Sequence, residues 1–338
     1  MFQTASACGP APPEISGVPA DGSIVRVSDF GGHQLQQKRP THPNGVGDFD
    51  GDGVDDVFLA TGAAWYYSPR GKAEWRYLAG GRTDRIESLL FGDFDGDGRT
   101  DVVGKNGNDL MVSWGGISAW ERLNTTSAPI SDLAIGDFND DGFADILWAD
   151  GTTANWYRSS AGSGPFLLAN TSSRRVSELR FGHFSICGGG HETDVFGMNG
   201  GRWSVSCGAI SPWASLLVSL TYSIDNSLFV ADFDGNGYAG VARATPLINL
   251  VNGVIGWMWQ LSPDGTQDWS SHQNYVTSTS ACNLTFPDVW NAGVVGIGRF
   301  DETKKSDILL WGDAYHNNFC IVPGGTGSAQ RQSRQDMR

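Results

Sequence analysis

The chain has 338 residues, of which 40% are hydrophobic and 18% are charged, and its formal net charge is −14. This length and hydrophobicity allow a large core, in one repeat-built domain or in two ordinary ones. The negative charge argues against nucleic acids and anionic membranes as partners, and no apolar run approaches the ~20 residues of a membrane-spanning helix.

Taken in chain order, the sequence predicts three parts. Residues 1–22 form an irregular N-terminal segment, 23–325 a single domain, and 326–338 a C-terminal tail. At the start of the domain, Ser23 to Asp29 and Gln34 to Lys38 have the composition of short strands. The acidic segments of the domain begin after them, at Asp48.

Three segments share a pattern of Asp or Asn at relative positions 1, 3, 5 and 9, with glycine at position 6. Acids this closely spaced repel one another unless a cation lies among them, and hard oxygen ligands suit calcium. Position 7 would add a backbone carbonyl. The predicted ligands are Asp48, Asp50, Asp52, Val54 and Asp56; Asp93, Asp95, Asp97, Arg99 and Asp101; and Asp137, Asn139, Asp141, Phe143 and Asp145.

An EF-hand and a solvated turn are two other interpretations of these segments. An EF-hand needs a bidentate Glu at position 12 and flanking helices, whereas Leu89 to Phe91 and Val102–Val103 around the second segment have strand composition. A solvated Asp/Gly turn without an ion remains the alternative. Three copies in one frame favour about three calcium ions.

The segments belong to a longer repeat. Their first positions fall at Asp48, Asp93, Asp137, His183, Asp232 and Arg299, in steps of 45, 44, 46, 49 and 67 residues. A period near 45 with four short strands per unit is typical of propeller blades. The predicted fold class is therefore an all-β propeller of four-stranded blades, with six repeats counted and a seventh blade left open. We expect Gln34–Lys38 to supply the fourth strand of the last blade.

Two of the later segments have changed. The fourth has His183, Ser185, Cys187 and Asp194, and it has lost its other acids. Because the first loop and the last turn of a blade lie at the same end, we predict a Cys187–Cys207 disulfide in place of the ion; two free thiols are the alternative. The fifth keeps Asp232, Asp234 and Asn236 but has Gly240 at position 9, which predicts a weak fourth calcium site or none.

These motifs resemble the FG-GAP/VCBS repeats of propellers in integrin α-subunit heads and in some fungal and bacterial lectins. The matching segments are Gly47 to Asp56, Phe91 to Asp101 and Gly136 to Asp145. The resemblance implies an extracellular recognition module with structural calcium on one face, and with ligands on the other face or between blades. Weak calcium sites also fit extracellular calcium levels, which predicts a secreted or extracellular protein.

Three functions are conceivable for such a module. In lectin-like carbohydrate binding, Trp65, Trp156, Trp203 and Trp259 would stack on sugar rings; packing between blades is the alternative for each tryptophan. A protein-binding adhesion or assembly subunit would use the insertion Ala281 to Asn291, with Phe286 and Trp290. We do not expect an enzyme, because the sequence lacks HExxH, GxSxG and a Gly-rich phosphate loop. The expected partner is thus a glycan or a cell-surface protein.

Overall fold

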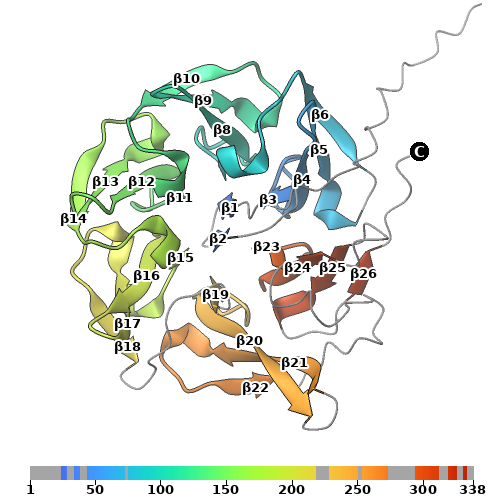
Figure 1. The fold of residues 1–338 in the computed structure, drawn as a ribbon, viewed down its shortest axis with the longest axis vertical. Coiled ribbons are helices and arrows are strands. Elements are labelled where there is room, and N and C mark those ends of the chain that lie inside the picture. The colour runs from blue at the N-terminus through green and yellow to red at the C-terminus, as the bar shows by residue number, and fades with distance from the viewer. Residues whose placement is uncertain are drawn as a thin grey trace, which may run out of the picture.

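A computed structural model describes residues 24–28, 34–38, 44–72, 75–217, 228–249, 253–272, 294–311, 319–325 and 330–332. Their strands form six four-stranded sheets arranged in a ring (Figure 1). Each sheet is one blade, and its strands run antiparallel in chain order from the centre to the rim. The predicted class, an all-β propeller of four-stranded blades, is confirmed.

The strands follow the predicted repeat. Blades 1 and 2 consist of β3 (Asn44–Gly47), β4 (Asp56–Ala60), β5 (Ala64–Ser68) and β6 (Arg76–Gly80), then β7 (Leu90–Gly92), β8 (Asp101–Asn106), β9 (Asp109–Ser113) and β10 (Glu121–Thr125). Blades 3 and 4 consist of β11 (Leu133–Gly136), β12 (Asp145–Asp150), β13 (Asn155–Ser159) and β14 (Leu167–Thr171), then β15 (Arg180–Gly182), β16 (Asp194–Asn199), β17 (Arg202–Ser206) and β18 (Ala214–Leu217). Blades 5 and 6 consist of β19 (Leu228–Ala231), β20 (Gly240–Asn249), β21 (Gly253–Ser262) and β22 (Ser270–His272), then β23 (Val294–Gly298), β24 (Asp307–Trp311), β25 (Phe319–Val322) and β26 (Gln330–Gln332).

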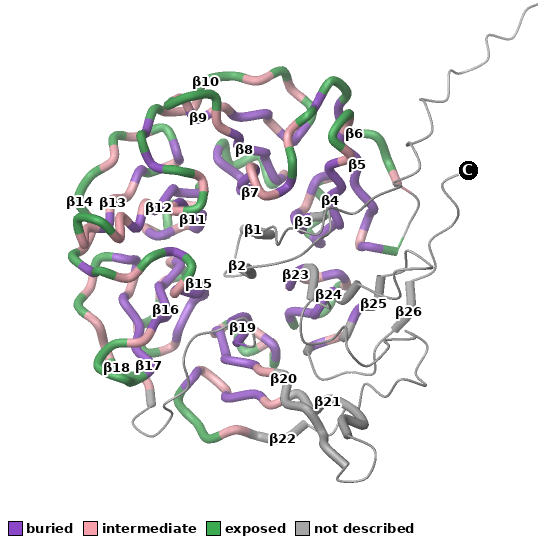
Figure 2. Tube along the Cα trace, viewed as in Figure 1, coloured by how far each residue is buried: buried purple, intermediate pink, exposed green. Residues whose placement is uncertain are grey.

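The core lies between neighbouring blades. Inner strands are buried and outer strands are largely exposed (Figure 2). Side chains from both faces of the middle strands therefore pack against the neighbouring blades. Phe58 and Trp65 of blade 1, for example, share a cluster with Phe91 of blade 2. Among the described residues, no helical segment has the length and hydrophobicity needed to cross a lipid bilayer.

Backbone hydrogen bonds close the ring. We call the segment between the first and second strands of each blade loop 1 to loop 6, after its blade. In every loop the residue before position 9 donates its N–H to the carbonyl of position 1 in the preceding blade. The six bonds are Thr100 to Asp48 (2.6 Å), Ala144 to Asp93 (2.7 Å), Thr193 to Asp137 (2.5 Å), Ala239 to His183 (2.6 Å), Ser306 to Asp232 (2.6 Å) and Asp55 to Arg299 (2.8 Å). Because the last bond joins the first blade to the sixth, six blades complete the circle.

Hydrogen bonds also join outer strands to the next blade. We call the turn between the third and fourth strands of a blade its outer turn. Asn124 Nδ2 on β10 donates to Ser159 Oγ (2.9 Å) and to the carbonyls of Gly162 and Gly164 (both 2.8 Å) at the outer turn of blade 3. Asn170 on β14 binds the outer turn of blade 4 in the same way, through Ser206 Oγ.

The N-terminal hairpin does not lie where the sequence predicted. β1 (Ile24–Ser28) and β2 (Gln34–Lys38) pair in a separate two-stranded sheet at the centre of the ring (Figure 1). β1 contacts β3, β7, β11 and β23, and β2 contacts β15, β19 and β23. The hairpin therefore touches the innermost strand of every blade.

The expectation that Gln34–Lys38 completes the last blade is therefore wrong. β26, from the C-terminal part of the chain, pairs with β25 and is the fourth strand of blade 6. A local outer turn suffices to place β26 beside its neighbour, so no exchange of chain ends is needed. The domain consequently extends to Gln332 at least, beyond the predicted boundary at 325.

Candidate functional site

Position 9 of the loops is an aspartate in five of the six blades, and it joins each loop to its outer turn. Asp56 Oδ2 accepts the N–H of Phe49, and Oδ1 accepts the N–H of Arg70 in the outer turn, both at 2.9 Å. Asp101, Asp145, Asp194 and Asp307 make the same pair of bonds. The carboxylate is thus part of the architecture, even in blades 4 and 6, where most other acids are missing.

Burial perturbs these five carboxyls. It raises the pKa of Asp56 to about 8, against the opposing effect of the two N–H donors. The pKa values of Asp101, Asp145 and Asp194 rise to about 7 and that of Asp307 to about 6, with burial again the largest cause. A cation beside such a group would favour its charged form.

Loops 1 and 2 bring together the acids at positions 1, 3 and 9. Carboxylate oxygens of Asp48, Asp50 and Asp56 lie within 4.8 Å of one another, and so do those of Asp93, Asp95 and Asp101. In loop 2, Asp93 accepts the N–H groups of Gly96 (2.6 Å) and Gly98 (2.8 Å). Both glycines have positive φ, of 76° and 83°, which lets the chain fold tightly around the first aspartate.

The position 5 acids play a different part. Asp52 Oδ1 accepts the N–H of Val54 (2.9 Å), and Asp97 Oδ1 accepts the N–H of Arg99 (2.8 Å). These bonds fix the backbone at position 7, where a carbonyl ligand was predicted.

One buried oxygen in loop 1 has no partner. Asp50 Oδ1 is shielded from solvent and makes no hydrogen bond, while Asp50 Oδ2 accepts from Arg76 Nη1 (3.2 Å). Buried oxygens without donors are costly, and a divalent cation would satisfy this one. Carboxylate and carbonyl oxygens are the donors that calcium prefers, so the residues of loop 1 fit such an ion. Asp48, Asp50, Asp52 and Asp56 with the Val54 carbonyl would hold it.

Loops 3 and 5 have fewer carboxylates at positions 1, 3, 5 and 9 than loops 1 and 2. Asp137 accepts the N–H groups of Asp141 (3.2 Å) and Gly142 (2.9 Å), and Asn139 Nδ2 donates to Asp141 Oδ2 (2.8 Å). Loop 5 keeps this turn, since Asp232 accepts the N–H groups of Gly235 and Gly237. Because Gly240 brings no carboxylate, loop 5 lacks one ligand that loops 1 to 3 have.

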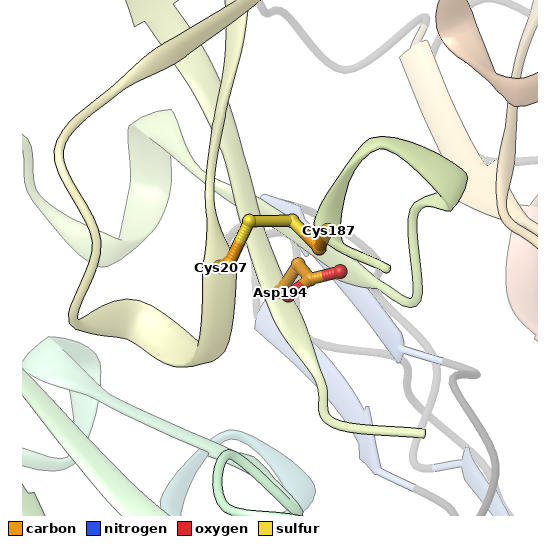
Figure 3. Close-up of side chains that lie close together, drawn as sticks. All are labelled: Cys187, Asp194 and Cys207. Atoms are coloured by element: carbon orange, nitrogen blue, oxygen red, sulfur yellow. A yellow bond between two sulfur atoms is a disulfide. The ribbon is translucent and has the colours of Figure 1, made fainter. Parts of the chain in front are cut away.

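Loop 4 is held by a disulfide. Cys187 in the loop is bonded to Cys207 in the outer turn, with a Cα–Cα distance of 5.5 Å, and Asp194 lies beside the bond (Figure 3). The predicted pairing is confirmed. The bond links the same two segments that the position 9 aspartate links.

The tryptophans proposed to bind sugar belong to the core. Trp65, Trp156 and Trp203 are each 0% exposed, and their rings meet Trp120, Trp213 and Trp269 edge to face at 5.4–5.5 Å. A ring without exposed surface cannot stack on a ligand, so this expectation is wrong for these three residues. The side chain of Trp259 and the insertion Ala281 to Asn291 lie outside the described residues.

A pocket of about 290 Å³ opens among the loops of four consecutive blades, and we call it the loop-face pocket. Loops 6, 1, 2 and 3 provide its lining, which consists of Arg299, Asp48, Gly53, Asp55, Asp93, Gly96, Gly98, Arg99, Thr100 and Gly142. The resemblance implied a ligand on the opposite face or between blades, so sequence reasoning missed this hollow. Arginines inside two acidic repeat motifs, Arg99 and Arg299, were the available signal.

Two arginines shape the pocket. Arg99 Nη2 donates to the carbonyl of Phe49 (2.7 Å), and Arg299 Nη2 donates to that of Gly53 (3.1 Å). The Arg299 N–H also donates to Asp55 Oδ2 (2.6 Å). At the edge, the Phe143 ring is 37% exposed and lies so close to Gly96 that a Cβ there would be 2.7 Å from it. Charged hydrogen-bonding groups therefore line the hollow, and the Phe143 ring lies next to its lining residue Gly96.

Comparisons with known proteins agree with this architecture. Residues 48–104 match the model of the FG-GAP-like repeat family. No curated protein matches the sequence. A lectin of Agrocybe aegerita, described as recognising non-reducing terminal N-acetylglucosamine, is similar in fold, with a TM-score of 0.52 and 14% identity over 94% of this chain and 92% of that one.

A second solved structure is less similar. The V. cholerae biofilm matrix protein Bap1 gives a TM-score of 0.31 and 17% identity over 76% of this chain, which spans 40% of that protein. The match to the FG-GAP-like repeat model and the six four-stranded blades identify the chain as a β-propeller that contains an FG-GAP-like repeat.

Proposed function

We propose that this protein is an extracellular, calcium-stabilised propeller that binds glycans, and that the loop-face pocket holds one sugar ring. The observation that carries the proposal is the pocket itself, because it gathers charged hydrogen-bonding groups next to the exposed side chain of Phe143. A volume of about 290 Å³ lies at the small end of ligand sites. It suits a monosaccharide unit better than a large ligand.

The lining has the chemistry that sugars need. Arg99 and Arg299 offer N–H donors to hydroxyl or acetamido oxygens, and the carboxylate of Asp55 offers an acceptor. The ring of Phe143 would pack against the apolar C–H face of a sugar. The Agrocybe lectin shares the fold, and its ligand therefore makes N-acetylglucosamine-terminated glycans the first ligands to test.

Calcium would act on the pocket through its walls. Loops 1, 2 and 3 line it, and loops 1 and 2 also carry the clustered carboxylates. Ions in these loops would offset the negative charge and hold the loops in one conformation. We therefore expect glycan binding to need calcium in the millimolar range of extracellular sites.

The test is a glycan array followed by calorimetric titration, each with calcium and with a chelator. We expect calcium-dependent binding that falls at least tenfold in Phe143→Ala and in Arg99→Gln. The matched control is Arg122→Gln, whose exposed guanidinium lies on β10 near Asp109, away from the pocket lining. An array without hits in calcium would reject glycan binding. If both pocket variants still bind the glycans that the parent binds, the pocket is not the binding site.

A further inference from the structure

We propose that loop 4 is a thiol-gated site for a soft divalent cation such as Zn²⁺, closed by the Cys187–Cys207 disulfide and opened by its reduction. The donors would be Cys187 Sγ, Cys207 Sγ, an Asp194 oxygen and His183 Nδ1. Such a site adds to the proposed glycan function and does not depend on it.

The first observation is where the donor atoms lie. The two sulfurs and a carboxylate oxygen of Asp194 lie within 4.8 Å of one another (Figure 3), as the carboxylate oxygens of loops 1 and 2 do. Asp194 also keeps the architectural bonds of position 9, to the N–H groups of Phe184 (2.8 Å) and Gly208 (2.9 Å). Loop 4 has therefore kept a cluster of donors and has replaced oxygen by sulfur.

The second observation is a buried imidazole beside the cluster. His183 is only 6% exposed, and its Nδ1 is a buried atom without a hydrogen-bond partner. This nitrogen lies 3.8 Å from Asp194 Oδ2 but is not one of the donors that lie within 4.8 Å of one another, so the sulfurs would move toward it once the S–S bond opens. The ring is held by contact with Tyr238, at 5.1 Å between centroids, and by a hydrogen bond to the Glu192 backbone. A ligating histidine is commonly oriented in this way by its other nitrogen.

The donor set selects the class of ion. Two thiolates, an imidazole and a carboxylate form a four-coordinate set of the kind that binds Zn²⁺, with Zn–S distances of about 2.3 Å and Zn–N distances of about 2.0–2.1 Å. Calcium prefers six to eight oxygens. Softer sulfur and nitrogen donors favour zinc and related metals over it. Loop 4 would thus bind a different metal from loops 1 to 3.

The gating step balances as a thiol–disulfide exchange. A dithiol reductant supplies two electrons and two protons and is itself oxidised to a disulfide, while the S–S bond breaks and each sulfur takes up a proton. A phosphine gives the same two thiols with water, which supplies both protons and the oxygen of the phosphine oxide. Metal binding then releases both protons as the two thiolates bind the ion. A disulfide oxidant reverses the sequence by reforming the S–S bond and expelling the ion.

The loop is built to allow this change. Cys187 and Cys207 are both partly exposed, so a small reductant can reach the bond. Gly188, Gly189 and Gly190 follow Cys187, and Gly188 has a positive φ of 106°. Such a segment can shift as the sulfurs separate to make room for the metal.

The experiment uses the full chain in a Cys8→Ser, Cys282→Ser, Cys320→Ser background, which leaves only the two cysteines of loop 4. Oxidised and phosphine-reduced samples are titrated with Co²⁺, a spectroscopic probe for tetrahedral zinc sites. We expect a sulfur-to-cobalt charge-transfer band that saturates at one equivalent in the reduced sample and is absent in the oxidised one. Zn²⁺ should remove the band, and oxidised glutathione should release the metal.

Two variants test the ligand assignment. Cys207→Ser should abolish the charge-transfer band, and His183→Gln should weaken Co²⁺ binding at least tenfold and shift the visible bands. A reduced sample that stays folded by circular dichroism and shows no band would overturn the proposal. If reduction unfolds the chain, Zn²⁺ should restore the fold; failure to do so would also overturn it. A His183→Gln variant that binds as the parent does would remove His183 from the site.

Discussion

Loop 4 should be stabilised by its disulfide and loops 1 to 3 by calcium, and each of the two can be removed separately. The test removes the disulfide with the pair Cys187→Ser and Cys207→Ser and compares the effect with calcium removal from the parent chain. Both act at the same end of their blades, where the loop meets the outer turn. The disulfide joins residues 20 apart in sequence, and this separation sets the expected size of its contribution.

The magnitude follows from loop closure. Cross-linking over about 20 residues removes unfolded-state entropy equivalent to about 3 kcal/mol at 25 °C. For a chain of this length the unfolding entropy is about 0.7 kcal/mol per kelvin, so the melting temperature should fall by about 4 °C. Calcium would contribute by linkage, at about 2.7 kcal/mol for each site when the free ion is 100-fold above its dissociation constant.

The assay is calorimetric melting of parent and variant, each with saturating calcium and with chelator. The two losses should add, because the disulfide and the calcium loops belong to different blades and share no ligand. If the variant and the parent have the same melting temperature in calcium, the disulfide does not stabilise the fold. A parent indifferent to chelator would refute the calcium interpretation of loops 1 to 3 and leave the disulfide argument intact.

Three further predictions concern charge and hydrogen bonding. In chelator, the free energy of unfolding should fall as pH rises from about 5 to about 8. The raised pKa values of Asp56 (about 8) and Asp101 (about 7) mean that the folded chain holds protons which the unfolded chain has released. Denaturant titrations across this range should show this slope and calcium should flatten it, whereas a level profile in chelator would contradict the prediction. Arg76→Gln should tighten calcium binding at loop 1 several-fold, as measured by terbium luminescence, because it removes the guanidinium that pairs with Asp50. The control is Arg122→Gln. If both variants bind calcium with equal affinity, the Arg76–Asp50 ion pair does not compete with the ion. Asn124→Ala should cost about 2 kcal/mol of stability, because three acceptors in blade 3 lose their donor. The control is Asn108→Ala, at an exposed turn. If denaturant titrations show equal losses of stability in the two variants, Asn124 is not a link between blades.

The repeat could be predicted from sequence because one physical requirement recurs in every blade. Each first loop must turn sharply and return to the sheet, so aspartates and glycines fall at fixed spacing around Asp48, Asp93 and Asp137. The same regularity located the disulfide, since Cys187 and Cys207 fall in two segments that every blade brings together. Local chemistry and spacing were sufficient for these features.

The tryptophans could not be assigned in this way, because spacing alone does not distinguish core from surface. Trp65 and Trp203 recur with the period of the blades, as either a sugar platform or a packing residue would. What decides their burial is the neighbouring blade, whose Trp120 and Trp269 cover them. The position of β1 and β2 at the centre of the ring was hidden for a related reason, since no local signal in these ten residues indicates six separate neighbours.

The loops also separate two roles that the sequence presents as a single motif. Blade 6 has lost the acid at position 1 but keeps Asp307, with both backbone bonds from Phe300 (3.0 Å) and Gly324 (2.8 Å). Blade 5 shows the reverse, since Asp232 keeps its turn bonds while Gly240 stands at position 9. The position 9 aspartate is therefore present even where the set of ion ligands is incomplete. Its hydrogen bonds between loop and outer turn do not depend on a metal. Both roles coincide around Asp56 and Asp101, where three carboxylates lie within 4.8 Å of one another.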